Sequence, residues 1–189
     1  LEYADDAGDT IVVAAGTYTL PLDIRSDGLT ITGAFDPDHI GEVRLDFDGE
    51  GILVYSDQVT LSGLTITGGD GLHDAISAVH SEGLQLNDIR IEDYDGNGLV
   101  ASGVTTTVSL YDGRFERLGG IAVSVERAAA ASLHSSRLTG FAQGSTPPVL
   151  ANVIGEGSTL FMDHTVVYGA WRNCVRSSDG ALLDITNSI

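Results

Sequence analysis

The chain of 189 residues is long enough for one domain, and its hydrophobic fraction of 42% is adequate for a buried core. It carries 27 acidic and 9 basic residues, for a net charge of −18, and every basic residue is arginine. Nucleic acid is therefore not expected as a partner, because phosphate binding needs a basic surface. Membrane insertion is not expected either, because no apolar run reaches the roughly 20 residues of a spanning helix.

The N-terminal part of the chain has the pattern of short strands separated by glycine turns. Residues 8–18 contain an Asp-Thr-Ile-Val-Val strand, a glycine turn and a Thr-Tyr pair. Leu, Ile, Val and Thr alternate with polar residues again over 29–33 and 59–69, and a sustained helical period is missing. The pattern predicts an all-β fold.

The segment 59–69 recurs along the chain, and its copies align into three columns of apolar residues. The first column, at spacings of 23 to 27 residues, contains Leu61, Leu86, Leu110, Leu133, Leu160 and Leu183. The second, five residues later in each copy, contains Ile66, Ile91, Phe115 and Leu138. The third contains Ile76, Leu99, Ile121, Val149 and Cys174. The single cysteine is therefore expected to be a small core residue, and no internal disulfide is expected.

Three apolar strands per copy cannot bury their hydrophobic sides unless neighbouring copies stack on them. The pattern predicts a solenoid of about eight coils, each with three short strands. In this register the chain begins and ends in mid-strand, so we expect residues 1–189 to form a single domain of a longer protein. Uncapped strand edges at the two ends favour end-to-end association of copies.

The opening strand and Gly-Thr-Tyr turn, with the Leu-Thr-Ile-Thr-Gly run of 29–33 and the similar run of 59–69, resemble the pectin-lyase-like parallel β-helix proteins. Within that family the chain is most similar to large secreted surface proteins with a CSLREA-type entry segment. The resemblance implies a right-handed, single-stranded parallel β-helix. It also implies an extracellular or cell-surface location. These motifs specify a fold rather than an activity.

Two coils are expanded by loops, over 34–42 and 141–148, and loops that leave a regular scaffold often carry function. The first contains Asp-Pro-Asp-His at 36–39, which resembles a segment of β-helical alginate epimerases. Eight positions after the first apolar column come Tyr94, Leu118, Phe141 and Tyr168. Their shared register predicts a stack of side chains at one corner of the coil.

An outward position four residues after the first column contains Thr65, Arg90, Arg114, Arg137, His164 and Asn187. Two residues further on the outward position contains Thr67, Glu92, Glu116, Thr139 and Val167. One interpretation is a solvated ladder of Arg and Glu. The other is a track that binds the carboxylates or sulfates of an acidic polysaccharide through Arg90, Arg114, Arg137 and His164. Arg137 and His164 lack a Glu neighbour in this register, which makes them the better ligand candidates.

A lyase acting on uronic acids needs a cation for the carboxylate, a base for the C5 proton and an acid for the leaving oxygen. The resemblance implies Lys or Arg as the base, often with calcium as the cation. Because the chain lacks Lys, only Arg, His or Tyr could act as the base, and the nearest local group of these types is His164, Tyr168 and Arg172. These three are the candidate catalytic residues.

No dedicated metal site or cofactor is expected from the sequence. Calcium is a candidate ligand because Asp93, Asp95 and Asn97 offer hard oxygen atoms in one loop, although turn chemistry also explains these residues. His73, His80 and His134 have no evident partners and are expected to pack at surfaces or corners.

Three functions are compatible with the sequence. The leading hypothesis is a noncatalytic β-helix module of a secreted or cell-surface protein that acts as a spacer, an adhesive module or a self-associating unit. It depends on the regular repeats, the missing lysine base and the missing Asn-Thr-Asp, paired-Asp and Gly-His-Gly motifs of polygalacturonase-like hydrolases. The alternatives are a polysaccharide lyase or epimerase that uses the arginine and histidine row, and a carbohydrate-binding module that uses the same row without turnover.

Overall fold

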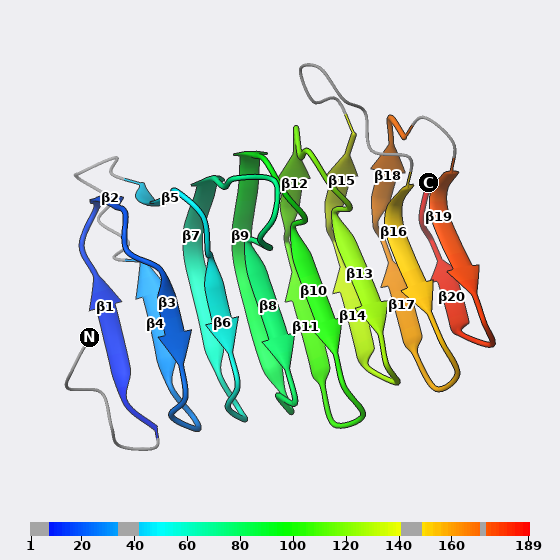
Figure 1. Ribbon diagram of the computed structural model, residues 1–189, viewed down its shortest axis with the longest axis horizontal. Helices are drawn as coiled ribbons and strands as arrows, with labels where there is room; N and C mark the ends of the chain where they lie inside the picture. The colour runs from blue at the N-terminus through cyan, green and yellow to red at the C-terminus, as the bar shows by residue number, and fades with distance from the viewer. Residues whose placement is uncertain (1–7, 34–41, 141–148, 171–172) are drawn as a thin grey trace.

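The chain is an all-β solenoid in which parallel strands stack in about seven turns (Figure 1). This computed structural model describes residues 8–33, 42–140, 149–170 and 173–189, and within them every regular element is a strand. The colours of Figure 1 run from blue at one end of the long axis to red at the other, so successive turns lie side by side along that axis. The predicted fold class is thereby confirmed as a parallel β-solenoid.

Two sheets carry the described strands, and all strand pairs are parallel. The main row of the first sheet contains β1 (Thr10–Val13), β4 (Thr30–Gly33), β7 (Thr60–Gly68), β9 (Leu84–Tyr94), β11 (Thr107–Tyr111), β14 (Ala130–His134), β17 (Thr159–Asp163) and β20 (Leu182–Thr186). A second row in the same sheet adds β2 (Gly16–Tyr18), β5 (Val43–Phe47), β12 (Arg114–Glu116), β15 (Arg137–Thr139) and β18 (Val166–Tyr168). The second sheet contains β3 (Leu22–Ile24), β6 (Ile52–Val54), β8 (Ile76–Val79), β10 (Leu99–Ser102), β13 (Val123–Glu126), β16 (Val149–Ile154) and β19 (Asn173–Ser178).

One turn of the solenoid consists of a strand from each of these three rows. In the turn that begins at β11, the chain passes through β12 and β13 and returns as β14 beside β11. β7 and β9 are long because each runs through the first two rows without a break. The predicted three strands per turn are therefore present.

The first apolar column is confirmed over four turns and then changes register. Leu61, Leu86, Leu110 and Leu133 are register partners in sequence and are completely buried. The partner of Leu133 in the next turn is Met162, whereas Leu160 is the partner of Ala131. The predicted places of Leu160 and Leu183 in this column were therefore wrong by two residues. Both Leu160 and Met162 point inward because residues two apart in a strand lie on the same face of the sheet.

The second column is confirmed, since Ile66, Ile91, Phe115 and Leu138 are register partners and all are buried. The third column begins as predicted, with Ile76 beside Leu99, and then continues through Val123, Ala151 and Val175. Ile121, Val149 and Cys174 were therefore misplaced. Cys174 is exposed, contrary to the core position predicted for it.

A sharp bend separates the first strand row from the second, and it needs one residue with left-handed backbone geometry. Asp88, Asp112, Ser135 and His164 occupy this position in successive turns, with φ angles of 50° to 55°. Asp and Asn tolerate this region better than most residues because their short polar side chains bond locally. His164 is therefore a bend residue, and its side chain leaves the solenoid from the corner.

Candidate functional site

The main candidate surface is the outer face of the second strand row, where two lines of polar side chains run along the solenoid. Register pairs define the first line as Arg44, Thr65, Arg90, Arg114, Arg137 and Val166. They define the second line as two runs, Asp46 with Thr67 and then Glu92, Glu116, Thr139 and Tyr168, and a register shift between β7 and β9 separates the runs. We refer to the first line as the arginine row and to the second as the acidic row.

The arginine row differs from the predicted row after Arg137, where His164 and Asn187 were expected. Arg90, Arg114 and Arg137 are neighbours as predicted, but the partner of Arg137 in the next turn is Val166. The prediction that His164 belongs to this row was wrong because of the same two-residue register shift that affects Leu160. It lies at the bend, where its Nδ1 is 2.9 Å from the Oδ2 of Asp163.

Asp163 is a well-satisfied carboxylate beside His164. Its Oδ1 accepts hydrogen bonds from the Asn187 amide at 3.0 Å and from the Thr186 hydroxyl at 3.1 Å. The hydrogen bond from Asn187 contributes most to lowering the pKa of Asp163, and the bonds from His164 and Thr186 add to it. Together they lower the pKa of Asp163 to about 2. His164 thus pairs with a structural carboxylate at the corner rather than with the arginine row.

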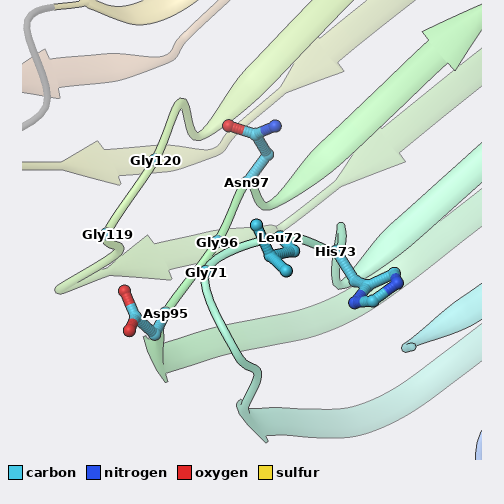
Figure 2. Close-up of a pocket in the computed structure, with 8 residues that line it drawn as sticks. All are labelled: Gly71, Leu72, His73, Asp95, Gly96, Asn97, Gly119 and Gly120. Atoms are coloured by element: carbon cyan, nitrogen blue, oxygen red, sulfur yellow. The ribbon is translucent and has the colours of Figure 1, made fainter. Parts of the chain in front are cut away.

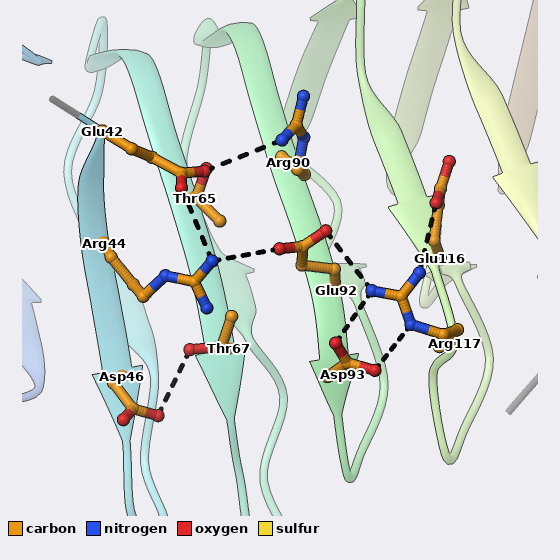
Figure 3. Close-up of polar contacts among 10 residues, drawn as sticks. All are labelled: Glu42, Arg44, Asp46, Thr65, Thr67, Arg90, Glu92, Asp93, Glu116 and Arg117. Carbon is orange, nitrogen blue, oxygen red and sulfur yellow. Dashed lines mark hydrogen bonds and ion pairs between the residues drawn. The ribbon is translucent and has the colours of Figure 1, made fainter. Parts of the chain in front are cut away.

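Most cations on this face are paired with carboxylates that lie in other turns (Figure 3). The Glu92 carboxylate accepts a hydrogen bond from Nη2 of Arg44 at 3.2 Å on one side and from Nη2 of Arg117 at 3.4 Å on the other. Glu42 lies 3.5 Å from Arg44 and 3.8 Å from Arg90, and it also accepts the hydroxyl of Thr65. Several of these ion pairs therefore run across the turns, and no ion pair within the described residues joins Arg90 to the Glu92 of its own strand.

Arg117 forms the shortest of these pairs, and the sequence did not predict it. Its Nε and Nη2 donate to the two carboxylate oxygens of Asp93 at 2.6 and 2.8 Å, a bidentate arrangement, and its Nη1 lies 3.5 Å from Glu116. The bond from Arg117 holds the pKa of Asp93 below its usual range. Both residues have left-handed φ angles at the corner that follows the acidic row.

Arg114 and Arg137 differ from the other arginines of this face. Arg137 donates to the hydroxyl of Tyr168, and its guanidinium carbon lies 5.2 Å from the centre of the Tyr168 ring. Arg114 is exposed, and within the described part of the chain its side chain makes no ion pair or hydrogen bond. These two neighbours are the cations of the row that do not bond to a described carboxylate.

Two of the three candidate catalytic residues lie in the described part of the chain, and each has a separate partner there. His164 lies at a bend with Asp163, and Tyr168 lies in the acidic row with Arg137. Arg172, the expansion loops and the Asp-Pro-Asp-His segment at 36–39 lie outside the described residues.

The predicted corner stack is present in part. Tyr94 and Leu118 are buried, and the Tyr94 hydroxyl donates to the carbonyl of Gly49 at 3.2 Å. Burial raises the pKa of this tyrosine to about 12. Tyr168 was predicted to join them, but it lies on the outer face and is 36% exposed, while Phe141 falls outside the described residues.

An aromatic ladder on the outer face of the first strand row was not predicted. The rings of Tyr111 and His134 are stacked, with centres 4.9 Å apart, and the ring of Phe161 lies 5.6 Å from that of His134. His134 was expected to have no partner, and this prediction was wrong. Tyr111 and His134 each directly follow a residue of the first apolar column, so extending that alignment by one position would have revealed the pair.

A small hollow lies where the loops before β8, β10 and β13 stack on each other (Figure 2). Four glycines line it together with side chains that include His73, Asp95 and Asn97. Its volume is about 90 Å³, whereas pockets that enclose a small-molecule ligand have roughly 300–1,000 Å³. The hollow is therefore too small to enclose a saccharide unit.

The polar side chains around this hollow bond to the solenoid itself. Asn97 donates to Asp74 at 2.9 Å and accepts from the backbone of Ile121 at 2.8 Å, while His73 lies 3.0 Å from Asp70. The described residues contain no group of three or more His, Cys, Asp or Glu side chains that could hold a metal ion. Calcium binding by Asp93, Asp95 and Asn97 stays a prediction.

No protein-family model, curated protein or solved structure matches the chain. The resemblance to pectin-lyase-like proteins therefore stays a prediction. Within the described residues, helices of the length and apolarity needed to cross a membrane are absent.

Proposed function

We propose that the chain is a noncatalytic, right-handed parallel β-helix module of a secreted or cell-surface protein. Right-handedness is supported by the strong general preference for right-handed crossovers between parallel strands. The eight strands of the main row support about eight coils when the incomplete turns at both ends are counted. In this proposal the module acts as a spacer or adhesive unit that associates with its own copies.

The observation that carries the proposal is the position of Glu92 between Arg44 and Arg117. The Glu92 side chain is 17% exposed, and its two partners come from strands or corners on both sides of it. A site built for turnover leaves its charged groups directed at a substrate. Here the charges of the outer face are used to join one turn of the solenoid to the next.

Incubation with alginate, pectate and chondroitin tests the proposal, with the absorbance of unsaturated products as the readout. We expect no product from the wild-type chain. Product formation that is lost in His164→Ala or Tyr168→Phe, but kept in the control His73→Ala, would establish a polysaccharide lyase instead. An epimerase would be detected by a change in uronate composition without chain cleavage.

Self-association is the second part of the proposal, and two apolar side chains of β20 provide the variant that tests it. Leu182 and Ile185 of β20 are 62% and 46% exposed, although Ile185 continues the first apolar column. Sedimentation velocity at rising concentration should show dimers or longer species. Leu182→Glu should reduce them, whereas Leu72→Glu, at a side chain that is 85% exposed in a corner loop, should not. A monomer at all concentrations would contradict this part.

A further inference from the structure

The arginines of the outer face fall into two groups according to their partners. Arg44, Arg90 and Arg117 each have a carboxylate oxygen within 3.8 Å or less. Arg114 and Arg137 bond to no carboxylate among the described residues. In a chain with a net charge of −18, they are two neighbouring cations that form no ion pair with the carboxylates of the described residues.

The two arginines are adjacent and point to the same side. Arg114 and Arg137 are register partners in β12 and β15, so their backbones lie about 4.8 Å apart. Like charges at directly opposed positions of a sheet destabilise it, and a bound anion would remove that cost. Each guanidinium group also carries paired N–H donors that match the oxygens of a carboxylate or sulfate.

Tyr168 fixes one of the two guanidinium groups in place. The Arg137 guanidinium donates to the Tyr168 hydroxyl and lies against its ring, which restricts a side chain that would otherwise be mobile. One of the five N–H donors of Arg137 makes this bond, so the others stay available. Val166 and Thr139, two other outward neighbours of Arg137, carry no charge. The carboxylate of Glu116, the register partner of Thr139, acts on Arg137 through its charge without an ion pair between them.

We propose that Arg114 and Arg137 form a binding site for one carboxylate or sulfate group of a sparsely charged saccharide. A densely charged polymer is disfavoured because its further anionic groups would meet Glu92 and Glu116 of the acidic row. A saccharide is favoured by the aromatic ladder, since Tyr111 and His134 precede the two arginines by three residues each, across the bend. The proposal does not depend on the noncatalytic role, because binding and turnover are measured separately.

The test is an NMR titration of the arginine Nε–H signals. Methyl glucuronoside supplies a carboxylate, galactose 6-sulfate supplies a sulfate, and methyl glucoside is the neutral control. We expect saturable shifts at Arg114 and Arg137 with at least one of the two anions, and none with the neutral sugar. Equal shifts at Arg90 and Arg117, or shifts that do not saturate, would overturn the proposal.

Substitutions separate the pair from its surroundings. Arg114→Gln and Arg137→Gln should each weaken binding at least about tenfold, since a charge-assisted bond is lost. Arg90→Gln removes a partly exposed cation of the same row, one that already pairs with Glu42, and should leave affinity unchanged. Tyr168→Phe keeps the ring but not the hydroxyl, and we expect a loss of a few-fold because Tyr168 only positions Arg137. Affinity that is unchanged in Arg137→Gln would contradict the site.

Polymers test the requirement for sparse charge. Hyaluronan carries a carboxylate on alternate sugars, whereas pectate carries one on every sugar. On columns of equal carboxylate content, we expect stronger retention on hyaluronan, lost in Arg114→Gln. Stronger retention on pectate, or equal affinity for methyl glucuronoside and an N-acetyl glutamate peptide, would refute the proposed ligand. Cleavage of either polymer would instead refute the noncatalytic function.

Discussion

Replacing Glu92 with Gln should weaken the contacts that join neighbouring turns. The change keeps the shape of the side chain but removes the charge that Arg44 and Arg117 face at 3.2 and 3.4 Å. Exposed ion pairs contribute about 0.2–1 kcal/mol each, and Glu92 is the less exposed member of both pairs. We therefore expect a loss of about 1–2 kcal/mol in the free energy of unfolding.

Urea unfolding at low salt and at about 1 M NaCl measures this loss, because salt screens such pairs. The midpoint of Glu92→Gln should fall at low salt with an unchanged slope, and the difference from wild type should shrink in high salt. Combined with Arg117→Gln in a double-mutant cycle, the coupling should be about 0.5–1 kcal/mol. Glu82→Gln, at an exposed position without an ion pair among the described residues, is the control. A coupling of zero, or equal effects of the two Glu substitutions, would refute this reasoning.

Three further predictions concern a glycine, a carboxylate and the cysteine. Gly68→Ala should cost more than about 2 kcal/mol, because a Cβ there would lie 2.2 Å from the Phe47 carbonyl oxygen. Gly155→Ala has a similar φ, but a Cβ there would meet only the Ser158 Oγ at 3.9 Å, and urea unfolding should show the smaller loss. The pKa of Asp163 is lowered to about 2 in the folded chain, so its stabilising effect is present above about pH 4 and lost as the pH falls through 2. The stability difference between wild type and Asp163→Asn should follow that course in urea unfolding across pH. Cys174 should react with a thiol reagent in the native state at the rate of an unfolded control, and slow reaction would contradict its exposure.

The fold could be predicted because its strongest signal is periodic. Leu61 and Leu110 recur at nearly constant spacing, and stacking such positions is the way a short repeat buries its apolar face. The spacing fails after Leu133, where Leu160 and Met162 both face inward two residues apart. Apolar character alone does not distinguish these two registers, because each places a hydrophobic side chain in the core.

The charged site was predicted less well than the core because its contacts cross the register. The alignment gave Arg90, Arg114 and Arg137 as neighbours, which is confirmed. The pair of Arg117 and Asp93 was missed, although each directly follows an aligned residue of the acidic row, because both adopt left-handed geometry at the corner where the alignment stopped. Arg44 was also missed, because the preceding loop obscures its place in the repeat.

The central claim is that successive turns stack in the register described, and a pair of cysteines tests it most directly. Ser109 and Ser132 are outward register partners in β11 and β14 with their hydroxyl oxygens 3.2 Å apart. In a Cys174→Ser background, cysteines at 109 and 132 should form a disulfide readily, because paired strands place Cα atoms within the range for a disulfide. Cysteines at 111 and 132, two residues out of register, should not. Equal cross-linking of both pairs, or preference for the second, would contradict the stacked solenoid.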